Sequence, residues 1–99
     1  MRAFGPGESI VTRIGEPFAV DLDEPSATGY LFEPHFDPAQ LRLEEVERRP
    51  STVPGSVSRT RFVFVALAPS SSRLVFELCA PWDPSHAQEI AFLVLPTNS

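Results

Sequence analysis

Large apolar residues recur at every second position along several short stretches of this 99-residue chain. In Phe18–Asp23, Phe, Val and Leu alternate with Ala and Asp, which is the pattern of a strand with one buried face. In Arg59–Leu67, apolar side chains occupy both faces, which indicates a central strand of a sheet. The pattern predicts about seven short strands: Glu8–Ile14, Phe18–Asp23, Tyr30–Glu33, Leu41–Arg48, Arg59–Leu67, Arg73–Cys79 and Ala87–Leu95.

Residues Ala39–Arg49 allow two interpretations. The segment is long enough for a helix of about three turns. Leu41, Leu43 and Val46 do not share one face of a helix, however, whereas Leu41 and Leu43 fit the alternation of a strand. We therefore predict a strand over Leu41–Arg48.

Eleven prolines and five glycines leave little room for long helices, because proline breaks a helix interior. The chain is of single-domain size, and we treat residues 1–99 as one domain. About seven strands at roughly ten-residue spacing, with no convincing helix, are typical of a β-sandwich. We predict an all-β, immunoglobulin-like β-sandwich.

Three of the connections are rich in turn-forming or small residues: Pro25–Gly29, Val53–Ser58 and Ala80–Ser85. Successive strands run up and down, so every second connection falls at the same end of a sandwich. We expect these three at one end, which is the layout of a loop-based binding site. After the first of them, Tyr30 and Phe32 should point to one face and Leu31 to the other.

Trp82 is the only tryptophan and lies between Pro81 and Asp83-Pro84. Such a residue suits the anchor of a protein interface. The alternative is that its ring folds down to cap the end of the sandwich. Both interpretations place it in a connection and not in a strand.

The net charge is −5, with eight arginines and no lysine. The absence of a basic stripe argues against nucleic acid and against an anionic membrane surface as partner. The acidity favours solubility or, as an alternative, a basic partner surface. No stretch approaches the ~20 apolar residues of a membrane helix. The first residues do not form a signal peptide, and the compartment stays open.

Residues capable of catalysis or metal binding do not form a convincing cluster. One cysteine excludes an internal disulfide, and Cys79 at the end of an apolar strand suits a buried structural thiol better than a nucleophile paired with His86. His35 is far from His86 in the sequence, so we expect two ordinary loop histidines. The acidic run Asp21–Glu24 suits a solvated strand end better than a Ca²⁺ site. We predict no metal, no cofactor and no enzymatic activity.

The order of the three connections resembles the chagasin family of cysteine-peptidase inhibitors. The resemblance runs from about Gly15 to Leu95 and rests on Thr28-Gly29-Tyr30, on Gly55, and on Pro81-Trp82. The chain departs from the family pattern at several positions. Pro25-Ser26-Ala27 replaces Asn-Pro-Thr, Val57-Ser58 replaces glycines, and Ala80 replaces an arginine.

The resemblance implies a reversible inhibitor that blocks the active-site cleft of a papain-like cysteine peptidase with the three loops, without a cofactor. We expect a monomer. The implied contact residues are Ser26, Ala27, Thr28, Gly29, Tyr30, Gly55, Ser56, Val57, Pro81 and Trp82. The departures leave one alternative, a diverged immunoglobulin-like module that binds another protein and inhibits no peptidase.

Overall fold

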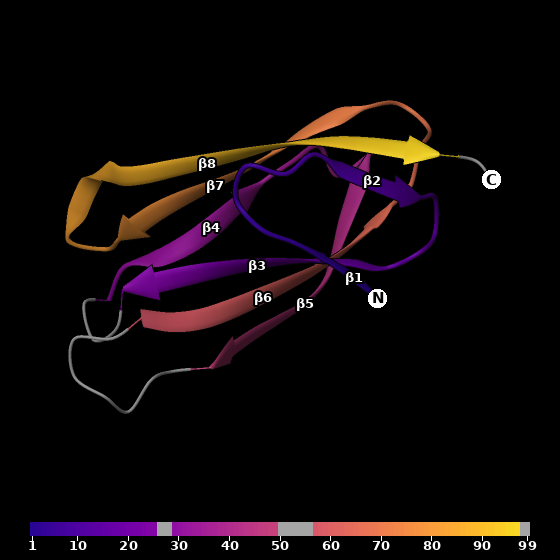
Figure 1. Cartoon of the computed structure of the whole chain (residues 1–99). Coiled ribbons are helices and arrows are strands. Elements are labelled where there is room, and N and C mark those ends of the chain that lie inside the picture. Colours follow the sequence, from indigo (N-terminus) through magenta and orange to yellow (C-terminus); the bar gives the residue numbers. More distant parts are fainter. Residues whose placement is uncertain (26–28, 50–56, 98–99) are drawn as a thin grey trace.

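The computed structural model describes residues 1–25, 29–49 and 57–97, except for the side chains of residues 83–87 (Figure 1). These residues form eight strands and no helix: β1 (Arg2–Phe4), β2 (Ile10–Arg13), β3 (Phe18–Pro25), β4 (Leu31–His35), β5 (Leu41–Arg49), β6 (Val57–Ala66), β7 (Ser72–Ala80) and β8 (Asp83–Thr97).

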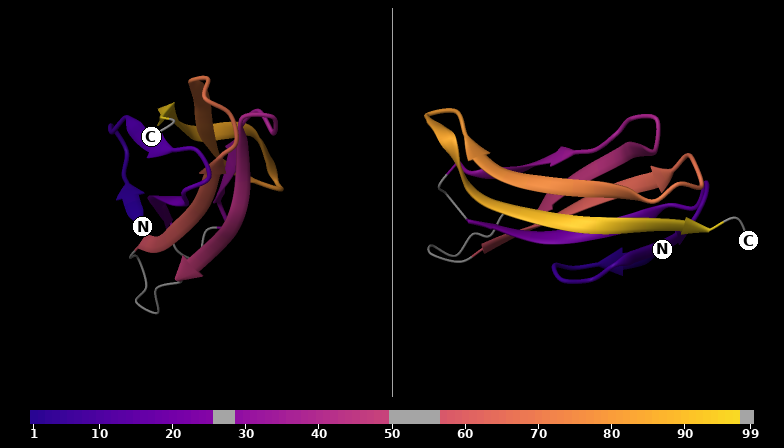
Figure 2. Two further views of the ribbon diagram at one scale, coloured as in Figure 1. Left: turned by 90° about the vertical axis from the view of Figure 1, so that its right-hand side faces the viewer. Right: turned by 90° about the horizontal axis from the view of Figure 1, so that it is seen from above.

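The strands make two four-stranded sheets, with the orders β1-β3-β6-β5 and β2-β8-β7-β4. The two sheets lie one above the other in Figure 1, and Figure 2 shows the same two layers from the end and from above. Strands β1 and β3, and strands β2 and β8, pair in parallel, and the other neighbours are antiparallel. The predicted all-β sandwich is confirmed.

Aromatic rings from both sheets fill the space between the layers. The Phe62 ring of β6 lies 4.9 Å from the Phe76 ring of β7, measured between centroids, so the two sheets are in direct contact. Each fully buried side chain of this size contributes about 1.5–3 kcal/mol. The core consists of Ile10, Phe18, Val20, Leu22, Phe32, Leu41, Phe62, Phe64, Ala66, Leu74, Phe76, Leu78, Phe92 and Val94.

Residues 41–49 form a strand, as predicted, and a register shift explains their irregular pattern. Leu41 pairs with Ala66 and Leu43 with Phe64, but the register shifts between Leu43 and Glu45, so that Val46 pairs with Phe62. One extra residue in a strand reverses the alternation of the residues that follow it. The three apolar side chains, Leu41, Leu43 and Val46, therefore share one face despite their uneven spacing.

The observed strands differ from the predicted ones by one additional strand and at the starts of two others. The prediction missed β1, which pairs in parallel with the first residues of β3. It placed Val57 and Ser58 in a connection, whereas they begin β6, and it started the last strand at Ala87, whereas β8 begins at Asp83. The short segment 67–71 joins β6 to β7 and crosses from one sheet to the other.

Proline lies within β4, which ends at His35 and not before Pro34. Strand β4 is at the edge of its sheet. The Phe32 amide N–H donates to the Glu24 carboxylate and so faces away from β7. Outward-facing amides recur at every second residue of an antiparallel edge strand, and Pro34 has no N–H to offer there. The free edge of β4 is thus protected against pairing with another strand.

One end of the sandwich gathers the strand ends that adjoin the three connections of interest. Pro25 at the end of β3 pairs with Val57 at the start of β6, and Arg49 at the end of β5 pairs with Arg59. The β7–β8 turn lies at this same end, and the end of β8 lies at the opposite one (Figure 1). The predicted common end is confirmed for these strand ends.

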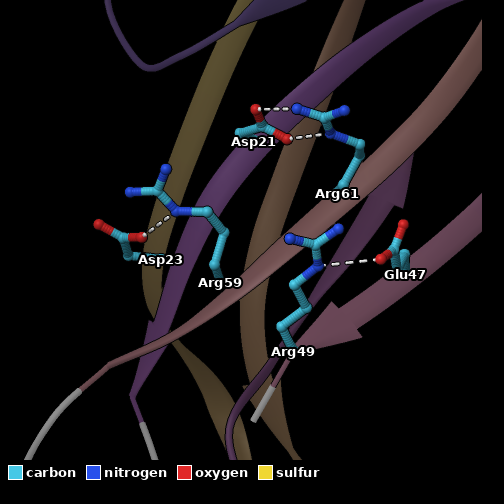
Figure 3. A network of polar contacts seen from close by, with 6 residues as sticks. All are labelled: Asp21, Asp23, Glu47, Arg49, Arg59 and Arg61. Atoms are coloured by element: carbon cyan, nitrogen blue, oxygen red, sulfur yellow. Dashed lines mark hydrogen bonds and ion pairs between the residues drawn. The ribbon is translucent and has the colours of Figure 1, made fainter. Parts of the chain in front are cut away.

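The outer face of the β1-β3-β6-β5 sheet carries charges in two rows across β3, β6 and β5 (Figure 3): Asp21, Arg61 and Glu47 in one row, and Asp23, Arg59 and Arg49 in the other. Arg61 donates two hydrogen bonds to Asp21, at 2.8 and 2.9 Å. Its hydrogen bonds and charge hold the pKa of Asp21 below the ordinary value of 3.8. Arg59 forms a longer pair with Asp23, at 3.4 Å.

Removing the Asp21–Arg61 pair should make the free energy of unfolding vary less with pH in the acid range. Because the pKa of Asp21 is lower in the folded than in the unfolded state, its contribution is complete above about pH 3.8 and is lost as the pH falls through the folded-state pKa. Both side chains are partly exposed, so the contribution is about 1 kcal/mol or less. Urea unfolding of wild type and Asp21→Asn should differ at pH 7, and the difference should shrink as the pH falls through the folded-state pKa of Asp21.

The exposed Arg42–Glu44 pair on β5 provides the control. The variant Arg42→Gln should change the free energy of unfolding little at pH 7 or in the acid range. A difference between wild type and Asp21→Asn that does not shrink as the pH is lowered from 7 into the acid range would contradict the assignment.

Candidate functional site

The structure describes half of the contact residues implied by the sequence. Gly29, Tyr30, Val57, Pro81 and Trp82 are described. The other five lie outside the described residues: Ser26, Ala27, Thr28, Gly55 and Ser56.

The third connection is much shorter than predicted. Ala80 ends β7 and pairs with Asp83, the first residue of β8, so the turn consists of Pro81 and Trp82 alone. Proline cannot donate to the ladder and pre-sets the backbone for a turn, which accounts for the end of β7 at this point. Trp82 stands at the tip of this short hairpin and is 64% exposed.

Gly29 lies directly beneath the Trp82 ring. Its φ is +78°, a conformation that side-chain-bearing residues rarely adopt. A Cβ at this position would lie 2.3 Å from Cη2 and 2.9 Å from Cζ3 of Trp82. Backbone and packing therefore both require glycine. The family resemblance implied that Gly29 is a contact residue, but it did not show that Gly29 packs against Trp82 of the same chain.

Tyr30 completes a contact between the first and third connections. The Tyr30 and Trp82 rings meet edge to face, with centroids 5.8 Å apart. Tyr30 also packs against the core, and Leu31 beside it is exposed while Phe32 is buried, as the predicted alternation requires. Trp82 thus packs against the first connection while most of its surface faces solvent, which combines parts of both interpretations offered for it. Val57 is likewise exposed, at the start of β6.

Glu24, at the base of the first connection, is buried, and its interpretation as part of a solvated acidic run was wrong. Its side chain is only 2% exposed. Its carboxylate accepts hydrogen bonds from the Phe32 amide at 2.7 Å, from the Thr60 hydroxyl, and from Arg48 Nε at 3.3 Å. The sequence carried a signal for this burial, because Glu24 continues the series Phe18, Val20 and Leu22 on the inward face of β3.

A groove of about 520 Å³ runs beside this end, between the edge strands β4 and β5. Its walls include the exposed side chains of Leu31 and Val46, and it reaches Gly29 and Pro81. This groove therefore places an apolar surface next to the Trp82 tip.

Catalytic chemistry finds no support among the described residues. They contain no cluster of side chains able to hold a metal ion. Burial and a hydrogen bond to Glu33 raise the pKa of the Cys79 thiol, which keeps it protonated at neutral pH. The prediction that His35 lies in a loop was wrong. It is the last residue of β4, and its Nε2 lies 3.2 Å from a carboxylate oxygen of Glu77. Within the described part of the chain, no helix is long and apolar enough to cross a membrane.

The sequence matches the model of the chagasin family of peptidase inhibitors, I42, over residues 11–94. The chain belongs to this family. It is accordingly a peptidase inhibitor and not an enzyme. No curated protein sequence matches it at a significant level.

Solved structures share the fold at low sequence identity. The cysteine protease inhibitor EhICP2 from Entamoeba histolytica superposes with a TM-score of 0.79 at 13% identity, over 97% of this chain and 95% of that one. Amebosin gives 0.74 at 17% identity, over 97% of both chains. PbICP-C, solved in complex with falcipain-2, gives 0.72 at 18% identity, over 98% of this chain and 100% of that one.

Proposed function

We propose that this protein reversibly inhibits papain-like cysteine peptidases by inserting the Trp82 end of the sandwich into the active-site cleft. The observation that carries the proposal is the contact between the first and third connections. Trp82 is exposed at the tip of a short hairpin and packs on Gly29 and Tyr30. Membership in a family of peptidase inhibitors and the complex that PbICP-C forms with falcipain-2 support the choice of target.

The shape of this end suits obstruction of a cleft. Gly29 has no side chain, so the Trp82 ring can rest directly on its backbone, and the first and third connections form one narrow tip. Trp82 supplies a large apolar surface on this tip, and aromatic residues of this kind dominate the energy of many interfaces. Because these residues already contact one another in the free protein, little further ordering is needed on binding. An interface of ordinary size buries about 800 Å² on each partner.

Inhibition without cleavage follows from the same arrangement. The backbone at Gly29 lies against the Trp82 ring. A substrate must instead present an extended peptide with its carbonyl carbon open to the catalytic thiolate. The inhibitor should therefore stay uncleaved after prolonged incubation with the peptidase.

A titration against papain and a cathepsin-like peptidase tests the proposal. Inhibition should be reversible, competitive with a peptide substrate, and detectable below micromolar inhibitor. The inhibitor should also slow alkylation of the catalytic cysteine by iodoacetamide, because both need access to the cleft. Trypsin, whose nucleophile is a serine, is the control and should be unaffected.

Absence of inhibition at micromolar protein would overturn the proposal. A pull-down that recovers a partner other than a peptidase, and that loses it on Trp82→Ala, would favour the diverged binding module instead. Cleavage of the inhibitor at the tip, seen by mass spectrometry, would show that it binds as a substrate.

A further inference from the structure

The first connection joins strands of different sheets. Glu24 lies in β3 of one sheet, and Phe32 lies in β4 of the other. A connection between sheets has no backbone ladder to hold its two ends at a fixed distance, unlike a hairpin. Some other contact must hold the two ends of this connection in place.

The Glu24 carboxylate makes that contact. One of its oxygens accepts the Phe32 amide N–H at 2.7 Å, which ties the residue just before the connection to a residue just after it. The other oxygen accepts hydrogen bonds from the Thr60 hydroxyl of β6 and from Arg48 Nε of β5, at 3.3 Å for Arg48. A single buried side chain on β3 therefore joins β4, β5 and β6.

Arg48, which donates to Glu24, also contacts the carbonyl group of Phe32. Its guanidinium lies 5.9 Å from the centre of the Phe62 ring, and a terminal nitrogen donates to the Phe32 carbonyl at 3.5 Å. The N–H and C=O of Phe32 are thus both engaged from the opposite sheet. Phe32 in turn continues directly into Leu31, Tyr30 and Gly29, which meets Trp82.

We infer that Glu24 is a positioning residue for inhibition: it holds the ends of the first connection so that Gly29 and Tyr30 rest against Trp82 in the free protein. This inference rests on the proposed function for its effect on affinity. Its structural part, the order that Glu24 confers on the Gly29–Trp82 contact, is testable without a peptidase.

The test compares Glu24→Ala and the isosteric Glu24→Gln with wild type. Alanine removes every acceptor. Glutamine keeps one acceptor oxygen but places an amide donor where Arg48 or the Phe32 amide also donates. The inhibition constant against papain should rise about tenfold for Glu24→Ala and less for Glu24→Gln, since a loop that must be ordered on binding loses affinity.

A matched control separates positioning from general destabilisation. Val94 is fully buried in β8 and pairs with Ile10 and Ser72, at the end of the sandwich remote from Trp82. Val94→Ala lowers core stability without touching the first connection. Folded Val94→Ala should inhibit with the wild-type constant. An equal loss of affinity in Val94→Ala, or an unchanged constant in both Glu24 variants, would overturn the inference.

A second readout keeps the two proposals distinguishable. Trp82 is the only tryptophan, so its fluorescence reports the contact with Gly29 directly. Acrylamide should quench Trp82 more strongly in Glu24→Ala than in wild type or Val94→Ala, with no peptidase present. If wild type fails to inhibit but this difference is found, the proposed function is wrong and the structural role of Glu24 stands. Equal quenching in all three proteins would refute that role.

Discussion

Replacing Gly29 with alanine is expected to weaken inhibition of papain by about a hundredfold, or about 2.7 kcal/mol. The new methyl group would lie 2.3 Å from Trp82 Cη2, so the ring or the backbone at residue 29 must move. The backbone at φ +78° adds a cost of about 1–2 kcal/mol for a residue with a side chain. Both effects act at the tip of the proposed interface. Inhibition constants, with thermal melting of each variant, measure the change.

Gly15 provides a matched control for the backbone part of this effect. Its φ is +82°, nearly that of Gly29, but a Cβ there would meet no atom within 4 Å. Gly15→Ala should thus lower the free energy of unfolding by a similar cost of the left-handed backbone conformation and leave inhibition unchanged. Combining Gly29→Ala with Trp82→Ala removes the clash, so the two losses should not add. Simple additivity, or full inhibition by Gly29→Ala, would show that the Gly29–Trp82 contact does not shape the binding tip.

The fold was predictable because its signals are local and repeated. Alternation in Phe18–Asp23 and two-sided burial in Arg59–Leu67 each identified a strand, and strand direction alone placed alternate connections at one end. The segment Arg2–Phe4 gave no such signal. It is too short for a period, and its strand exists only through its parallel pairing with β3. Pairing of this kind depends on tertiary structure, which a pattern within three residues cannot report.

The candidate site was predictable only in part, for a related reason. The motif Thr28-Gly29-Tyr30 and Trp82 could be found in the sequence, but the packing of Gly29 against Trp82 joins residues that are distant along the chain. Glu24 was missed because a carboxylate beside Asp21 and Asp23 was interpreted by its charge and not by its position in the alternation. A buried carboxylate needs donors, and these come from residues 32, 48 and 60, which no local pattern connects.

The contacts around Glu24 and those around Trp82 hold opposite ends of one short segment. The Glu24 carboxylate accepts a hydrogen bond from the Phe32 amide at one end, and the Trp82 ring of the β7–β8 hairpin covers Gly29 at the other. Residues 29–32 are thereby held by contacts at both ends. Such preorganisation lowers the entropy lost on binding and makes affinity sensitive to residues that need not contact the peptidase.

Truncating Trp82 should have the second large effect. Trp82→Ala is expected to raise the inhibition constant about thirtyfold, or about 2 kcal/mol, which is the usual threshold for an interface hot spot. Because the side chain is 64% exposed, the folded protein loses little burial, and the lost edge-to-face contact with Tyr30 is worth about 0.5–1.5 kcal/mol. Binding should therefore suffer more than stability. Inhibition constants and urea unfolding of the same samples give the two quantities.

Leu67 supplies a control, an exposed apolar residue at the far end of β6. Its side chain is 41% exposed and lies beyond the last residue of that strand, so Leu67→Ala should leave inhibition unchanged. Trp82→Phe tests how the ring acts, because it keeps an aromatic surface over Gly29 while reducing the area offered to a partner. Recovery of most of the affinity in Trp82→Phe would indicate that the ring acts mainly by supporting the first connection. A loss close to that of alanine would indicate direct contact with the peptidase, whereas unchanged inhibition in Trp82→Ala would remove this end from the interface.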